Sequence, residues 1–213
     1  MLHVCTDRRG SARAGITAAA LALLLTGCAS VSERSVDESV EVSDAARQEF
    51  AAALADMQAG HWMSAERRLR ALEARQPALP GPRVNLAIVL RELGEADSAQ
   101  ELLEETVREH PDFAPAHHQL ALLLREQGRF EAADAAYAAA LAADPEYALA
   151  HFNRAVLNDL YLARPSVALL HFERYQDMHG DEPDAEVARW IVELRRRVEA
   201  DASLRVADSG GGA

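Results

Sequence analysis

Lysine is absent from this chain, and its 22 basic side chains, all arginine, face 34 acidic ones, for a formal charge of −12. This charge excludes nucleic-acid binding through a basic surface, because phosphate backbones attract excess positive charge. Aromatic residues are also scarce, at 5% of the 213 residues. A sandwich or barrel needs more aromatic and β-branched side chains than this alanine-rich chain offers, so the composition predicts an all-α fold.

Cysteine is nearly absent as well, and its two copies, Cys5 and Cys28, lie near the N-terminus. The residues around them have the layout of an export signal: three arginines, an apolar run over residues 14–25, and a small-residue site just before Cys28. The apolar run is shorter than the roughly 20 residues that a helix needs to cross a bilayer. The pattern therefore indicates export and not a membrane-spanning helix.

The end of this signal, Leu25-Thr26-Gly27-Cys28, resembles the lipobox of bacterial lipoproteins. The resemblance implies that residues 1–27 are a lipoprotein signal peptide and that Cys28 carries the acyl chains, palmitate among them. Residues 1–27 contain one acidic and three basic side chains, so the mature chain would carry −14. An anionic membrane surface repels such a body, so the acyl chains would have to hold it. An ordinary cleaved signal is the alternative, but no Ala-x-Ala site follows closely.

The residues after the lipobox bear on the destination of the chain. Ala29, and not Asp, follows Cys28. By similarity to the sorting pattern of Gram-negative lipoproteins, this predicts a lipid-anchored protein of the outer membrane that faces the periplasm. The Arg8-Arg9 pair lacks the apolar residues that usually follow a twin-arginine motif, so general secretion is favoured. Residues 28–43 have the composition of a flexible tether, and residues 201–213 of a disordered tail.

An internal repeat organises the rest of the chain. Similar residues recur at a step of 34: Gly60, Gly94 and Gly128; Ala65, Ala99 and Ala133; Pro77, Pro111 and Pro145. Between them, apolar residues are spaced three and four apart, as in amphipathic helices. Glycine suits the point where a helix ends and the chain reverses, and proline suits the end of the second helix. Each unit is therefore predicted to be two helices and a turn.

This pattern resembles the tetratricopeptide repeat (TPR), whose 34-residue helix pairs stack into a superhelix. The resemblance implies a TPR solenoid over residues 44–200, with about four helix-turn-helix units and a C-terminal capping helix over residues 184–199. The fourth unit departs from the pattern. Arg154 takes the place of Leu86 and Leu120, and no glycine marks the turn. We expect an insertion there.

The resemblance also implies a peptide-binding groove along the first helices of the repeats. The contact positions of the family fall on Val84, Asn85, Ile88, Arg91, His118, Gln119, Leu122, Arg125, Phe152, Asn153 and Val156. Three of these, Asn85, Gln119 and Asn153, would form a ladder of amides that can pair with a peptide backbone, since an amide both donates and accepts. Alternatively, they only solvate a helix face or hold helices together. The apolar and arginine neighbours would suit a peptide with hydrophobic anchors and acidic character.

Other chemistry finds little support in the sequence. The TPR clamp that holds a C-terminal carboxylate needs a lysine, which the chain lacks, so binding of chaperone C-termini is disfavoured. Nucleophile-elbow, zinc-protease and phosphate-loop motifs are missing, so we predict neither an enzyme, nor a small-molecule substrate, nor a cofactor. His117 and His151 would lie a full unit apart, too far for one metal ion, whose ligands sit about 2.1 Å away. We therefore predict no metal site.

The function that follows is a membrane-anchored periplasmic scaffold that binds envelope proteins or peptide segments. The strings Asn158-Asp159-Leu160-Tyr161-Leu162 and Ala188-Arg189-Trp190-Ile191 resemble proteobacterial TPR lipoproteins described as accessories of TonB-type systems. That resemblance implies a setting and not an activity. Two alternatives are a type IV pilus pilotin-like assembly lipoprotein and a purely structural spacer in an envelope complex.

Overall fold

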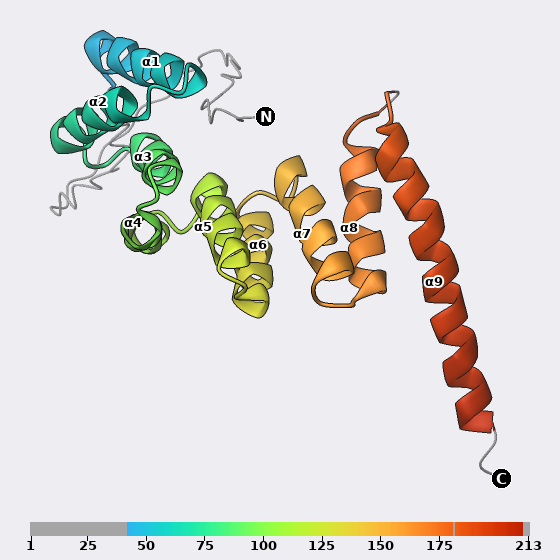
Figure 1. Ribbon diagram of the computed structural model, residues 1–213. Helices are drawn as coiled ribbons and strands as arrows, with labels where there is room; N and C mark the ends of the chain where they lie inside the picture. Colours follow the sequence, from blue (N-terminus) through green and yellow to red (C-terminus); the bar gives the residue numbers. More distant parts are fainter. Residues whose placement is uncertain (1–41, 181, 211–213) are drawn as a thin grey trace, which may run out of the picture.

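The computed structural model describes residues 42–180 and 182–210, with side chains as far as residue 204. The predicted signal peptide, the lipidated Cys28 and nearly all of the tether lie outside these residues. The described part contains nine helices and no strand (Figure 1): α1 (Asp44–Gln58), α2 (Trp62–Arg75), α3 (Pro80–Glu92), α4 (Ala96–Glu109), α5 (Ala114–Glu126), α6 (Phe130–Ala143), α7 (Ala148–Leu160), α8 (Pro165–Asp177) and α9 (Ala185–Gly210). Within residues 42–180 and 182–210, no helix is both long and apolar enough to cross a membrane.

The helices form four consecutive hairpins, α1/α2, α3/α4, α5/α6 and α7/α8, and α9 packs on the last of them (Figure 1). Each hairpin contacts the next one along the chain. This arrangement confirms the predicted all-α solenoid of about four units with a capping helix.

The turns of the first three hairpins form where the sequence places glycine. Gly60, Gly94 and Gly128 have φ angles of 73°, 85° and 74°. Residues with a side chain rarely adopt this left-handed backbone conformation, whereas glycine does so without steric cost. The amide after Gly60, that of His61, donates back to the carbonyl of Asp56 at 2.8 Å, which closes the helix end. The repeat of glycines thus determines where the chain reverses.

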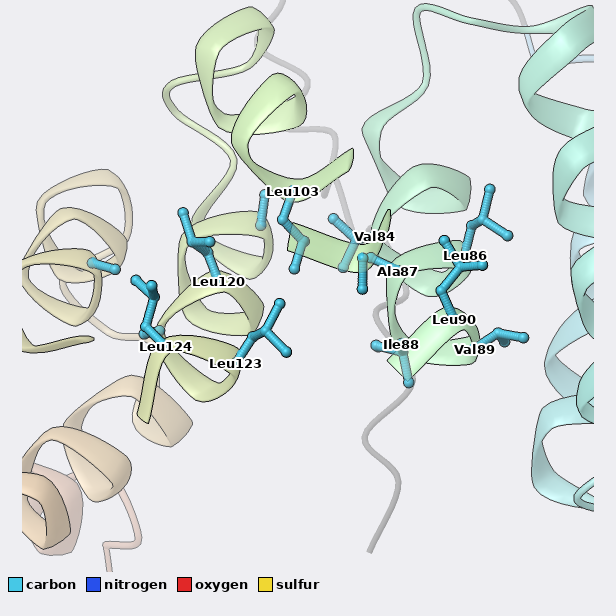
Figure 2. Close-up of a cluster of buried hydrophobic side chains, with 14 of the residues drawn as sticks. Val84, Leu86, Ala87, Ile88, Val89, Leu90, Leu103, Leu120, Leu123 and Leu124 are labelled. Atoms are coloured by element: carbon cyan, nitrogen blue, oxygen red, sulfur yellow. The ribbon is translucent and has the colours of Figure 1, made fainter. Parts of the chain in front are cut away.

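The interior of the solenoid is built from aliphatic side chains on both faces of the first helices. In α3, every residue from Pro82 to Leu90 is buried. Figure 2 shows that Leu86 and Leu90 point to one side of α3, while Val84 and Ala87 lie on the other side near Leu103 of α4. Alanines at the repeat positions, such as Ala99 at 1% exposed, allow the helices to approach closely.

The fourth hairpin departs from the pattern as expected. Its turn has no glycine, and Ala163 adopts a positive φ of 50° instead. Pro165 then begins α8, where its missing N–H costs nothing.

The C-terminal helix is longer than predicted. Asp184 Oδ1 accepts from the amides of Glu186 and Val187 at 2.9 and 3.1 Å, and thereby caps the start of α9. The sequence predicted a cap ending near residue 199 and a disordered tail over 201–213, but α9 continues to Gly210. This corrects the predicted tail over residues 201–210, while residues 211–213 lie outside the described residues. Residues 199–207 contain neither glycine nor proline, so each added residue can continue the hydrogen-bonded helix.

Candidate functional site

The predicted groove residues on α3 are mostly buried. Val84 is 0% exposed, Asn85 1% and Ile88 6%. Arg91 is more accessible, and its guanidinium pairs with Glu92 at 3.1 Å and with Glu126 of α5 at 3.6 Å. Among the predicted groove residues on α3, Arg91 is therefore the one whose polar group is accessible to a partner.

The groove residues on α5 and α7 are brought together in one polar contact. Asn153 Nδ2 donates to His118 Nε2 at 3.1 Å, which links the two helices. The His118 ring also packs against Tyr147, with centroids 5.1 Å apart, and against Tyr137 of α6, at 5.8 Å. His118 itself is buried, while Gln119, Leu122, Arg125, Phe152, Asn153 and Val156 are all half-buried. The more accessible part of the predicted groove thus lies on α5 and α7.

The amide ladder is less accessible than expected. Asn85 Nδ2 donates to the carbonyl of Gly81, and Asn153 Nδ2 to that of Leu149, each at 2.9 Å and each one turn back in its own helix. Asn85 is also buried, so one rung is closed to a peptide. Gln119 lines a small cavity of about 10 Å³ with Ile88 and Arg91. The assignment of these residues to a peptide groove remains a prediction.

Aromatic rings cluster at the C-terminal end of the stack. Phe152 lies 5.9 Å from Phe172, 5.1 Å from Tyr175 and 6.1 Å from Trp190 between ring centroids. Trp190 also lies 5.4 Å from Phe172 and is 36% exposed. These rings combine α7, α8 and α9, so a predicted groove residue sits at the edge of a partly exposed aromatic surface.

Trp190 is a candidate site residue that the repeat pattern in the sequence did not place in the groove. In α9 the buried residues are Val187, Ile191 and Leu194, in the same spacing as Ala116, Leu120 and Leu123 of α5. In this register α9 corresponds to the first helix of a fifth repeat unit. Trp190 then occupies the repeat position that Gln119 has in α5 and Asn153 has in α7. Val192 is 48% exposed, and no second helix covers it among the residues that the structure describes. The spacing of buried positions could have revealed this from the sequence.

The sequence analysis also missed a buried histidine pair. His151 Nδ1 lies 2.8 Å from His171 Nδ1, and His151 Nε2 lies 3.1 Å from the carbonyl of Pro145. A carbonyl can only accept, so Nε2 of His151 carries the proton and its Nδ1 accepts from His171. Burial lowers the pKa of His171 to about 4, with Arg154 and His151 contributing in the same direction. The sequence signal that could have found this pair was the predicted hairpin, because the two helices of one hairpin are in contact.

A larger cavity than the one beside Gln119 lies elsewhere, between α2 and α4. It measures about 540 Å³ and is lined by Arg70, Glu73, Leu86, Leu90, Ser98, Glu101, Leu102, Glu104, Glu105 and Arg108. It is open and polar, and none of the predicted groove residues lines it. Within the part of the chain that the structure describes, no three His, Cys, Asp or Glu side chains are grouped as metal ligands.

Tyr137 of α6, which packs against His118, provides a test of how the core beside the predicted groove is packed. The ring is fully buried, burial raises the pKa of its phenol well above the ordinary value, and its hydroxyl has no hydrogen-bond partner among the described residues. A buried unpaired hydroxyl costs about 1–3 kcal/mol. We expect Tyr137→Phe to raise the free energy of unfolding by about 1 kcal/mol in urea titrations. Tyr161→Phe, at a 50% exposed residue, should change it by less than about 0.5 kcal/mol; equal effects would contradict the burial argument.

Two profiles of the tetratricopeptide repeat family match the chain, one over residues 56–124 and one over residues 118–183. Together they span more than half of its length. No curated protein matches the sequence.

Solved structures share the fold at low sequence identity. A tetratricopeptide repeat protein from Parabacteroides merdae superposes with a TM-score of 0.58 at 20% identity, over 78% of this chain and 66% of that one. The pilF protein of Pseudomonas aeruginosa gives a TM-score of 0.62 at 23% identity, over 79% of this chain and 78% of that one. YrrB, described as a TPR protein with an unusual peptide-binding site, gives 0.52 at 19% identity, over 71% of this chain and 75% of that one.

Proposed function

Because this chain belongs to the tetratricopeptide repeat family, whose members act as scaffolds for protein–protein interaction, we propose that it is an envelope scaffold that binds a protein segment along α5, α7 and α9. TPR proteins are generally not enzymes, and the groups described above fit binding better than catalysis. The partner we infer is an extended peptide or helix of another envelope protein, and the anchor is the acylated Cys28.

The observation that carries this proposal is the accessible strip along these three first helices. Leu122, Phe152 and Val156 are half-buried, and Trp190 is 36% exposed. Apolar and aromatic groups of this kind form the anchors of interfaces, and the half-buried Gln119 and Arg125 beside them supply polar contacts. Since Val84, Asn85 and Ile88 are buried, we assign the main contact area to the C-terminal half of the predicted groove.

The lipid anchor supports the same proposal. A protein tethered to a membrane meets partners on that membrane at a raised effective concentration, so even a modest groove affinity suffices for capture. An accessory role in a TonB-type system is our first choice of pathway, on the strings noted in the sequence. A pilotin-like role is the alternative, since pilF of Pseudomonas aeruginosa shares the fold.

Photocrosslinking in intact cells tests the groove. A photoreactive residue at Gln119 lies between the apolar strip and Arg91, while one at Glu104 is exposed on α4, away from it. We expect one envelope protein to be captured from Gln119 at least about tenfold more efficiently than from Glu104. Adding Trp190→Ala should reduce that capture. Capture from Glu104 alone, or equally from both positions, would overturn the proposal in favour of a spacer or another binding face.

A further inference from the structure

The packing of α7 on α6 differs from the earlier junctions between hairpins. Leu86 and Leu120 occupy equivalent places, 34 residues apart, and both are buried in the larger apolar cluster. The next residue in this series is Arg154, whose side chain is 20% exposed. An arginine thus replaces the leucine that joins one hairpin to the next.

Arg154 meets a carboxylate of α6. Its Nε and Nη2 donate to Asp134 at 2.8 and 3.3 Å. Asn158, which is 0% exposed, donates to the same carboxylate at 2.8 Å, and Arg164 lies 3.6 Å from it. Although burial acts to raise the pKa of Asp134, the hydrogen bonds from Arg154 and Asn158 hold it below its usual value. One ionised carboxylate therefore receives three groups from α7 and the turn after it.

The apolar core is also divided near this place. The larger cluster runs through the first three hairpins and takes Leu157 from α7. The smaller cluster consists of Ala155, Ala168, Phe172, Val187, Ile191 and Leu194, all on α7, α8 and α9. The bond between His151 and His171 joins α7 to α8 and so lies within this second group. Each side of the junction has its own internal contacts. Two polar contacts cross the junction: the hydrogen bond from Asn153 to His118, and the cluster at Asp134, which receives hydrogen bonds from both Arg154 and Asn158.

We propose that the contacts of Asp134 with Arg154, Asn158 and Arg164, here called the lock, hold together two cooperative units, α1–α6 and α7–α9. Breaking these contacts lets α7–α9 open as one unit while α1–α6 stay folded. In a solenoid, stability is the sum of repeat terms and nearest-neighbour interface terms, so one weakened interface separates the chain into two units. Removing a charge from a part-buried pair leaves its partner unpaired, which weakens that interface selectively.

The lock also bears on binding. The contact of His118 with Asn153 crosses from the third hairpin to the fourth, so opening of α7–α9 would remove part of the groove. A segment bound across α5 and α7 would keep the lock intact, because a ligand stabilises the state that it binds. This consequence rests on the proposed function, whereas the lock itself does not.

Hydrogen exchange followed by mass spectrometry tests the lock on the purified full-length protein, without any partner. For Asp134→Asn, we expect slowly exchanging amides of α7 and α8 to exchange about tenfold or more faster, while those of α3 and α5 are unchanged. Asp56→Asn is the matched control. That carboxylate is also hydrogen-bonded to an arginine, Arg68 at 2.9 Å, but only within the first hairpin, so α7 and α8 should be unaffected.

A second variant gives the third junction between hairpins, α6/α7, the residues of the second, α4/α5. Asp134 and Arg154 stand where Gln100 and Leu120 stand one unit earlier. In Asp134→Gln with Arg154→Leu, the amides of α7 and α8 should become protected as strongly as those of α3 and α5. Unchanged or uniformly faster exchange in Asp134→Asn would overturn the proposal. If Asp134→Asn does not fold, a double variant that exchanges like the wild type would overturn it instead.

Discussion

Replacing Cys28 with alanine is expected to release the protein from the membrane into the soluble periplasmic fraction. The anchor that we propose consists of acyl chains on this thiol, and each buried CH₂ contributes about 0.8 kcal/mol. The rest of the mature chain carries a strong negative charge and would not bind an anionic surface by itself. The effect should be nearly complete, measured as the fraction of protein in sedimented membranes and as incorporation of labelled palmitate.

Cys5→Ala is the matched control for this experiment. Cys5 lies inside the predicted signal peptide, so its loss should change neither acylation nor sedimentation. Incorporation of labelled palmitate into Cys28→Ala at the level of the wild type would contradict the lipid anchor. Transfer of both single variants to the soluble fraction would show that export itself had changed.

Arg83→Ala is expected to destabilise the second hairpin more than any other single loss of charge. The side chain is 6% exposed and lies between three carboxylates: Glu73, 3.5 Å from its Nε, Glu105, 2.5 Å from its Nη2, and Glu109, which pairs with its Nη1. Removing the cation leaves these acids close together, with Arg108, 3.7 Å from Glu105, as the cation that still pairs with one of them. Breaking a fully buried ion pair from one side costs about 3–5 kcal/mol. Because Glu105 and Glu109 are 45% and 46% exposed, we expect a smaller loss, of about 2 kcal/mol, in the free energy of unfolding.

Arg68→Ala is the control, measured by the same urea titrations. Arg68 also joins two carboxylates, Glu49 and Asp56, each at 2.9 Å, but its side chain is 38% exposed. Such pairs contribute about 0–1 kcal/mol. Arg83→Met with Glu105→Gln and Glu109→Gln should recover part of the loss, because it removes the unpaired charges. A loss for Arg83→Ala no greater than for Arg68→Ala would show that burial does not strengthen this cluster.

Much of the fold could be predicted because its signals are local. Gly60, Gly94 and Gly128 terminate helices through their own backbone freedom, and the alanine and leucine spacings define helix faces. The tail over residues 201–213 was predicted from its glycine-rich end, whereas α9 continues to Gly210 because residues 199–207 contain no helix breaker and extend an existing helix.

The candidate site was less predictable, because exposure and partners depend on several helices at once. Asn85 and Gln119 occupy the same position in successive repeats, yet of these two only Asn85 is fully buried. His151 and His171 are 20 residues apart and meet only because α7 and α8 pack as a hairpin. The proposed place of Trp190 in the groove likewise depends on the register with which α9 packs against α8.

The sequence by itself determined the repeat, the helical hairpins and the membership of a family of binding scaffolds, because a 34-residue period specifies one hairpin and its stacking on the next. Only the tertiary structure decided which groove residues remain accessible, and that Asp134 joins two separate apolar clusters. The physical reason is that burial and ion pairing arise where surfaces of different repeats come together. The repeat pattern, by contrast, consists of residues within each single repeat.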